Sequence, residues 1–129
     1  MLKTQVNPWA WQDKFQFSQA WRVDQPRSVV FLAGQSPVSA EGEMVAAGDF
    51  DGQVRQIFAN LCTVLEHAGA TFNDVVKVTV YLTDISKLRD YERVVSELVA
   101  GGKPAATALE VRSLAVPGMM IEVDAIAVL

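Results

Sequence analysis

The clearest periodic pattern lies in the middle of the chain. Apolar residues recur at steps of three and four positions over Val54–Ala68, which is the spacing of one helix face. Asp49 or Asp51 can cap the start of this segment, and Gly69 can stop it. A second stripe of the same spacing occupies residues 86–99. The pattern therefore predicts two amphipathic helices, each with a single buried face.

Other segments alternate or run apolar in the way that strands do. Residues 28–33 form a continuous apolar run, which is typical of a central strand, and residues 75–82 place valines and Leu82 on one face. Turn-forming residues separate these segments from their neighbours. The strands predicted in this way cover residues 15–19, 21–23, 28–33, 75–82, about 106–112 and about 119–128.

The order of these elements predicts an α+β fold made of one domain over residues 1–129. Each helix has only one apolar face, so both are expected to cover the same face of a single mixed sheet. Several strands are apolar on both sides, and the second face of the sheet must then be buried elsewhere. Oligomerisation is the economical solution for a chain of 129 residues.

Composition narrows the class of protein. Half of the residues are apolar, and the formal charge of -4 includes no run of like charges, so no basic footprint for nucleic acid is visible. One cysteine, Cys62, and one histidine, His67, cannot make a multi-ligand zinc site, and no cofactor motif is present. The first residues show no long apolar h-region and no cleavage-like site, and no apolar run approaches membrane length. We expect a cytoplasmic protein without a membrane partner.

Seven short segments resemble, in order, the Rid family, whose members are also called YjgF-like proteins. The resemblance implies a chorismate-mutase-like domain that assembles as a homotrimer and binds small metabolites in clefts between subunits. A trimer would also bury the second face of the sheet, which the apolar strands require to be covered. The segments that carry the resemblance are Leu32–Pro37, Gly48-Asp49 with Gln53 and Asn60-Leu61, Ala68–Ala70, Asp74–Asp84, Pro104-Ala105 and Glu122–Ala127.

The resemblance also implies a chemistry. Active family members are enamine/imine deaminases, in which an arginine grips the substrate carboxylate by two parallel hydrogen bonds. A glutamate and backbone groups orient the water that attacks the imine carbon. The glutamate's position falls on Glu122, and the backbone amides are those of Gly34 and Gln35. The arginine's position falls on Ala106, and a frequent nearby cysteine falls on Ala108.

Two further positions of that cleft have lost their polar groups. Ala33 replaces a small hydroxyl residue, and Phe17 replaces a tyrosine. Arg112 cannot restore the missing arginine, because on an extended strand it is ~20 Å from Ala106. Other cations near the cleft read mainly as surface charge, although they could reach it from another subunit. These cations are Arg22, Arg27 and Lys103.

Three functions follow from this pattern of retained and lost residues. The first is a deaminase for imines or enamines that lack the usual carboxylate, with Glu122 positioning water. The second is a non-catalytic trimeric protein that binds a metabolite in the same clefts. The third, ribonuclease activity, is disfavoured by the acidic charge. The aromatic residues of the N-terminal quarter either pack against the sheet or line the cleft; they are Trp9, Trp11, Phe15, Phe17 and Trp21.

Overall fold

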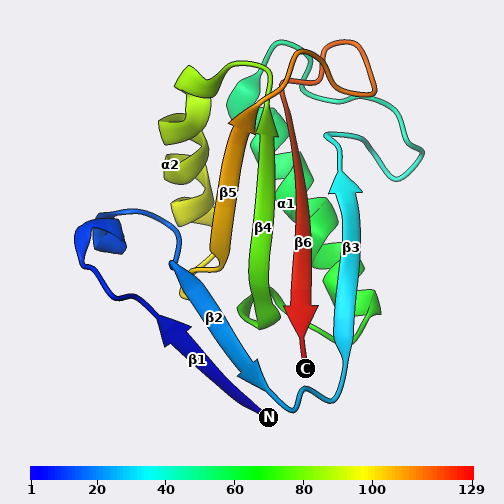
Figure 1. The fold of residues 1–129 in the computed structure, drawn as a ribbon. Helices are drawn as coiled ribbons and strands as arrows, with labels where there is room; N and C mark the ends of the chain where they lie inside the picture. Colours follow the sequence, from blue (N-terminus) through cyan, green and yellow to red (C-terminus); the bar gives the residue numbers. More distant parts are fainter.

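A computed structural model describes residues 1–129. Its main layer is a four-stranded sheet in the order β3-β6-β4-β5, in which β4 and β5 are parallel and the other neighbours are antiparallel (Figure 1). The elements in chain order are β1 (Leu2–Val6), β2 (Ala20–Asp24), β3 (Val29–Gln35), α1 (Phe50–His67), β4 (Val75–Leu82), α2 (Leu88–Leu98), β5 (Ala105–Glu110) and β6 (Ile121–Val128).

Both helices cover one face of this sheet, as the sequence predicts (Figure 1). One continuous core joins them to the strands, and the side chains of Ile57, Leu61 and Val123 within it are fully buried. The α+β architecture with a mixed sheet is therefore confirmed. Neither helix has the length and apolar character needed to cross a membrane.

The ends of α1 follow the signals in the sequence. The Asp49 side chain accepts a hydrogen bond from the Gly52 amide at 3.0 Å, which satisfies one of the free amides of the first turn. At the other end, the amides of Gly69 and Ala70 donate to carbonyls of the last turn, and Gly69 has a φ of 78°. A residue with a Cβ would be strained there, so glycine is the natural stop.

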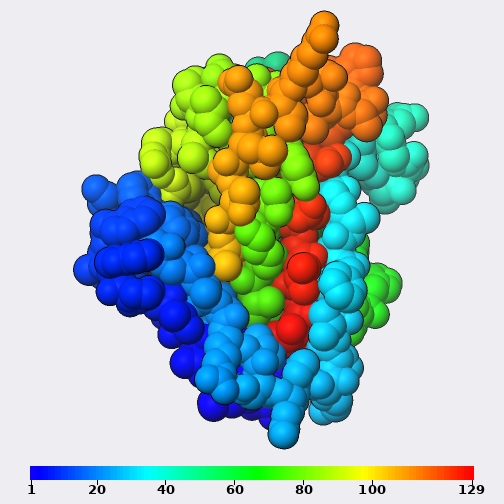
Figure 2. All heavy atoms as spheres, viewed as in Figure 1, coloured from blue at the N-terminus to red at the C-terminus, as the bar shows by residue number.

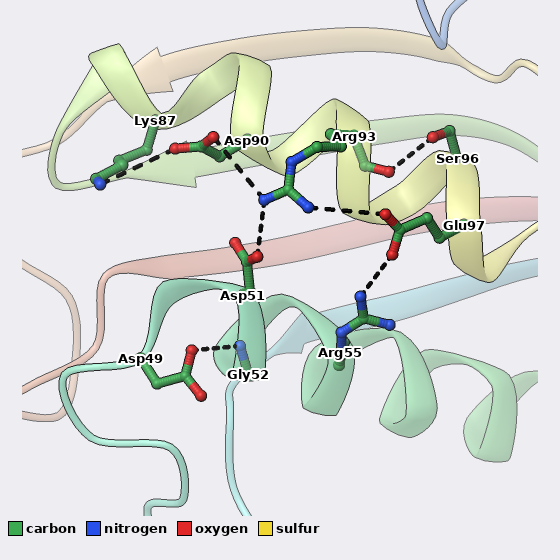
Figure 3. Close-up of polar contacts among 9 residues, drawn as sticks. All are labelled: Asp49, Asp51, Gly52, Arg55, Lys87, Asp90, Arg93, Ser96 and Glu97. Carbon is green, nitrogen blue, oxygen red and sulfur yellow. Dashed lines mark hydrogen bonds and ion pairs between the residues drawn. The ribbon is translucent and has the colours of Figure 1, made fainter.

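Ion pairs link the exposed sides of the two helices (Figure 3). Arg93 on α2 reaches Asp51 on α1 at 2.7 Å, and Arg55 on α1 reaches Glu97 on α2 at 2.6 Å. Arg93 also lies 3.7 Å from Glu97, so that the pairs form one network. These side chains are close to half exposed, and the network therefore supports the helix pairing set by the core rather than causing it.

The N-terminal segment departs from the prediction. Leu2–Val6 pairs antiparallel with Ala20–Asp24 as a separate hairpin, and the strand β1 was not predicted. The strand predicted at 15–19 is wrong: Ser18 alone makes a bridge, to Ala105, while residues 11–14 form a 3-10 turn. Aromatic side chains alternate over 15–17 because they close a cavity against α2, described below, rather than lining a sheet.

The position of β3 is a second correction. Residues 28–33 were expected in a central strand, but β3 lies at an edge of the sheet and pairs only with β6. Its apolar run still has a physical reason. Leu32 faces the core, while Phe31 lies on the face without helices and is 76% exposed. That open face of the sheet is the side toward the viewer in Figure 2.

Candidate functional site

Glu122 stands on the open face of the sheet, at the β3–β6 boundary. It lies opposite Tyr81 of β4 in the antiparallel register, and opposed residues share a face. Its carboxylate lies over the backbone of Gly34: a Cβ built there would lie 2.8 Å from the carboxylate carbon and from Oε2. The Ser36 hydroxyl donates to Oε1 at 3.5 Å. A glycine at position 34 is therefore what lets this carboxylate approach the strand.

The irregular end of β3 shapes this corner. Leu32 pairs with Ala125 and Gln35 pairs with Val123, so β3 uses one residue more than β6 between the two pairs. This bulge contains Ala33 and Gly34, both exposed. The side-chain Nε2 of Gln35 donates to the Ala33 carbonyl at 3.1 Å. The structure thus brings four predicted site residues together: Glu122, Ala33, Gly34 and Gln35.

A second carboxylate shares this face but has a partner. Tyr81 donates its hydroxyl hydrogen to Asp124 Oδ2 at 3.0 Å. This hydrogen bond is the main reason that the pKa of Tyr81 is raised, with burial and the charges of Asp124 and Glu122 adding to it. Asp124 is therefore tied to a structural hydrogen bond.

The remaining predicted site residues lie on the other face. Ala106 and Ala108 pair with Val78 and Val80 of β4, which point into the core beneath the helices. Together with Phe17 they line an apolar cavity of ≈ 290 Å³. Within one chain, Ala106, the position expected from the resemblance to correspond to an arginine, and Glu122 therefore lie on opposite sides of the sheet. The sequence could not separate them, because alternation along one strand does not fix the face of another.

The N-terminal segment forms the aromatic wall of this cavity. Trp11 packs edge-on against Phe17 at 5.8 Å between ring centroids, and Phe15 stacks on Phe17 at 6.1 Å. The segment is held to the start of β5, because Ser18 N donates to the Pro104 carbonyl at 3.1 Å and Trp21 Nε1 to the Lys103 carbonyl at 2.8 Å. Trp11, Phe15 and Phe17 therefore line a cavity, which is one of the two roles left open by the sequence, whereas Trp9 and Trp21 do not line it.

Arg89 and Glu92 lie at this cavity, and the sequence did not single them out. Their side chains form an ion pair, and the Arg89 guanidinium lies 4.3 Å from the ring centroid of Phe15. Glu92 also accepts a hydrogen bond from the Gln16 amide at 3.2 Å. On α2 the two residues are spaced i, i+3 beside the apolar stripe, a pattern that is typical of a solvated helix face.

The cations considered as replacements for the lost arginine have other partners or positions. Arg22 pairs with Asp24 at 3.0 Å, and Lys103 Nζ donates to the Asp13 carbonyl at 2.8 Å. Arg27 is exposed before β3, and Arg112 is exposed beyond the end of β5. None of the four lines the cavity.

Comparison with known proteins places this chain in a family. The sequence profile of the family described as "Endoribonuclease L-PSP" matches residues 10–129. The chain therefore belongs to the Rid family, the group that includes the YjgF-like and RutC proteins. A RutC family protein of Pyrococcus abyssi is 40% identical over 111 residues, which is 86% of this chain and 84% of that relative.

Two other relatives add detail. A mouse protein named 2-iminobutanoate/2-iminopropanoate deaminase is 31% identical over 112 residues, which is 87% of this chain and 80% of the mouse protein. The crystal structure of YyfB, a Rid family protein of unknown function from Yersinia pestis, superposes with a TM-score of 0.89 at 30% identity and covers 100% of both chains. The similarity to both proteins therefore spans most of the chain.

Proposed function

We propose that this chain is a hydrolytic deaminase of small imines or enamines and that Glu122 positions the attacking water. The observation that carries the proposal is the Glu122 carboxylate, which lies over Gly34 on an open sheet face with only a long contact to Ser36. A carboxylate in this setting can accept a hydrogen bond from water. The name of the mouse relative supports the same reaction class.

The reaction needs one water and no redox partner. Glu122 accepts a proton from water as the oxygen bonds to the imine carbon, and the C=N bond becomes a C–N single bond. That proton passes to nitrogen, which gives a neutral carbinolamine. Glu122 then carries the hydroxyl proton to nitrogen as the C–N bond breaks, and a carbonyl compound and ammonia leave. A carboxylate suits both steps because it can take up a proton and release it again.

We further propose that the complete site lies between copies of a homotrimer. Glu122 of one copy would work with Phe17, Ala106 and Ala108 of a neighbouring copy, since these groups lie on opposite faces of a single chain. The open face supports this assembly, because Phe31 is 76% exposed and Val29 is 45% exposed. Light scattering should give three times the chain mass, and Phe31→Asp should yield monomers; a monomeric parent protein would refute this assembly.

Ammonia release tests the reaction. Imines generated in situ by an amino-acid oxidase would be supplied at a constant rate, and ammonia formation followed with and without the protein. We expect Glu122→Gln to lose the acceleration, while the matched variant Asp124→Asn, on the same face and strand, keeps most of it. No acceleration with any imine, or equal rates for the parent protein and Glu122→Gln, would refute the proposal.

A second candidate is a binding protein without catalysis. The observation in its favour is the apolar cavity, which retains a ligand-sized volume while Ala106, Ala108 and Phe17 supply no polar group to it. Ligand-dependent thermal stabilisation without ammonia release would support this function. We keep ribonuclease activity as the least favoured candidate, since the net charge of -4 gives little attraction for phosphate.

A further inference from the structure

The size and the lining of the apolar cavity indicate which kind of ligand it can hold. Its floor is the helix face of β4 and β5, and α2 forms one wall. The other wall is the aromatic segment that contains Trp11, Phe15 and Phe17. An apolar cavity of about 150 Å³ holds a benzene molecule, so ≈ 290 Å³ gives room for a bicyclic ring.

The charges at the cavity cancel one another. Arg89 is the only Lys or Arg among the lining residues, and it is paired with Glu92 and stacked on Phe15. The Glu92 side chain is only 15% exposed and also accepts the Gln16 amide. Arg89 already balances the charge of Glu92, so a ligand carboxylate bound there would lie beside the poorly solvated Glu92 carboxylate without a cation of its own. Two carboxylates that share one cation repel each other, and an uncharged ligand avoids this cost.

One polar group in the lining lacks a partner within the chain. Tyr91 of α2 is 6% exposed, and its hydroxyl makes none of the hydrogen bonds in the structure, unlike that of Tyr81. Burial raises the pKa of Tyr91, so the phenol keeps its hydrogen near neutral pH. It can therefore give or accept one hydrogen bond with a ligand.

We infer that this cavity binds an uncharged aromatic small molecule of about ten non-hydrogen atoms, packed between the N-terminal aromatic residues and α2 and hydrogen-bonded to Tyr91. The inference rests on the proposed function for the identity of the site, because Phe17, Ala106 and Ala108 are the proposed substrate-binding residues. If the chain is a deaminase as proposed, the substrate is an imine or enamine with a bulky uncharged aromatic group. All the residues argued to hold this ligand line one cavity of a single chain, and its binding can be measured without turnover.

Calorimetric titration with three matched probes tests the inference. Indole has the expected size and one hydrogen-bonding group, benzofuran has the same shape without the N–H donor, and indole-3-carboxylate adds a charge. We expect indole to bind at least tenfold more tightly than indole-3-carboxylate, because the carboxylate finds no free cation. It should bind about threefold to tenfold more tightly than benzofuran, which is the usual contribution of one hydrogen bond.

Two variants locate the ligand. Ala108→Phe fills the cavity and should abolish indole binding. Tyr91→Phe keeps the cavity and should remove the difference between indole and benzofuran. Circular dichroism checks that both variants are folded. If Ala108→Phe does not fold, the affinities of Tyr91→Phe for indole and benzofuran still test the inference. Equal or tighter binding of indole-3-carboxylate, unchanged indole binding by folded Ala108→Phe, or an indole preference that survives in Tyr91→Phe would overturn the inference.

The inference and the proposed function can fail separately. Indole binding without ammonia release from any imine would refute the deaminase alone. Ammonia release from small imines that carry a carboxylate, together with no binding of either uncharged probe, would refute the uncharged aromatic ligand alone.

Discussion

Gln53 should be the polar side chain on which the stability of this fold depends most. It is fully buried in the first turn of α1, and its amide Nε2 donates to the carbonyls of Gly118 at 2.9 Å and Ala46 at 3.3 Å. Its Oε1 accepts the Met120 amide at 2.9 Å. One side chain thus satisfies backbone groups of the loop before α1 and of the loop that leads into β6.

Gln53→Met keeps the length of the side chain and removes all three hydrogen bonds. Each buried backbone group left without a partner costs about 1–3 kcal/mol, and the longer contact to Ala46 contributes least. Because methionine recovers some apolar burial, we expect a net loss of about 3 kcal/mol in the free energy of unfolding. At a urea m value of about 1.5 kcal/mol/M, the unfolding midpoint falls by about 2 M.

Urea unfolding followed by circular dichroism, at one fixed chain concentration, measures this change. The matched control is Gln56→Met on the same helix, which loses one side-chain hydrogen bond to Asn60 and should cost at most about 1 kcal/mol. Gln53→Glu keeps the acceptor but turns a carboxylate toward two carbonyls. It should be the least stable variant at neutral pH and should recover in acid, as its carboxyl gains a proton. Equal midpoints for Gln53→Met and Gln56→Met would refute this reasoning.

Further outcomes follow from Gly34, Tyr81 and Cys62. Gly34→Ala should reduce ammonia release toward the level of Glu122→Gln with little change in stability, because the new Cβ meets the carboxylate and not the backbone; full activity would contradict the geometry. The raised pKa of Tyr81 favours the protonated phenol in the folded state, so stability should fall as the pH rises above about 10. In a Tyr91→Phe background, Asp124→Asn should lower the midpoint of tyrosinate absorbance, and an unchanged midpoint would show that the hydrogen bond is not its cause. Burial raises the pKa of the Cys62 thiol, so its alkylation near pH 7 should be slower than that of a free thiol in urea.

The fold was predictable where local signals and burial agree. α1 has a capping Asp49, a one-sided apolar stripe and Gly69 at its end, and all three features survive in the structure. The position of β3 was not predictable. An apolar run indicates that both faces of a strand avoid water, but it does not show which neighbouring strands or helices bury them. Phe31 is apolar although no helix lies over it, and the run was read as a central strand.

The site residues were also predictable only in part. Glu122 and its neighbours on the open face were predictable from the motif and from the alternation along β6. The separation of Glu122 from Ala106 was not, since it depends on the parallel register between β4 and β5 that the α2 crossover sets. Arg89 also escaped notice. Its sequence neighbours are those of a surface arginine, and only the packing of residues 11–17 against α2 places it at the cavity.

The order of strands in the sheet has a consequence for how the chain is made. β3 finds its sole partner strand in β6, with Val29 paired to Val128, so β3 leaves the ribosome long before β6 exists. Translation of the intervening residues takes roughly 5–20 s at about 5–20 residues per second. During that interval the apolar Val29–Leu32 segment has no strand to pair with. Newborn chains should therefore be most exposed to misassembly, and most in need of chaperones, just before synthesis reaches β6.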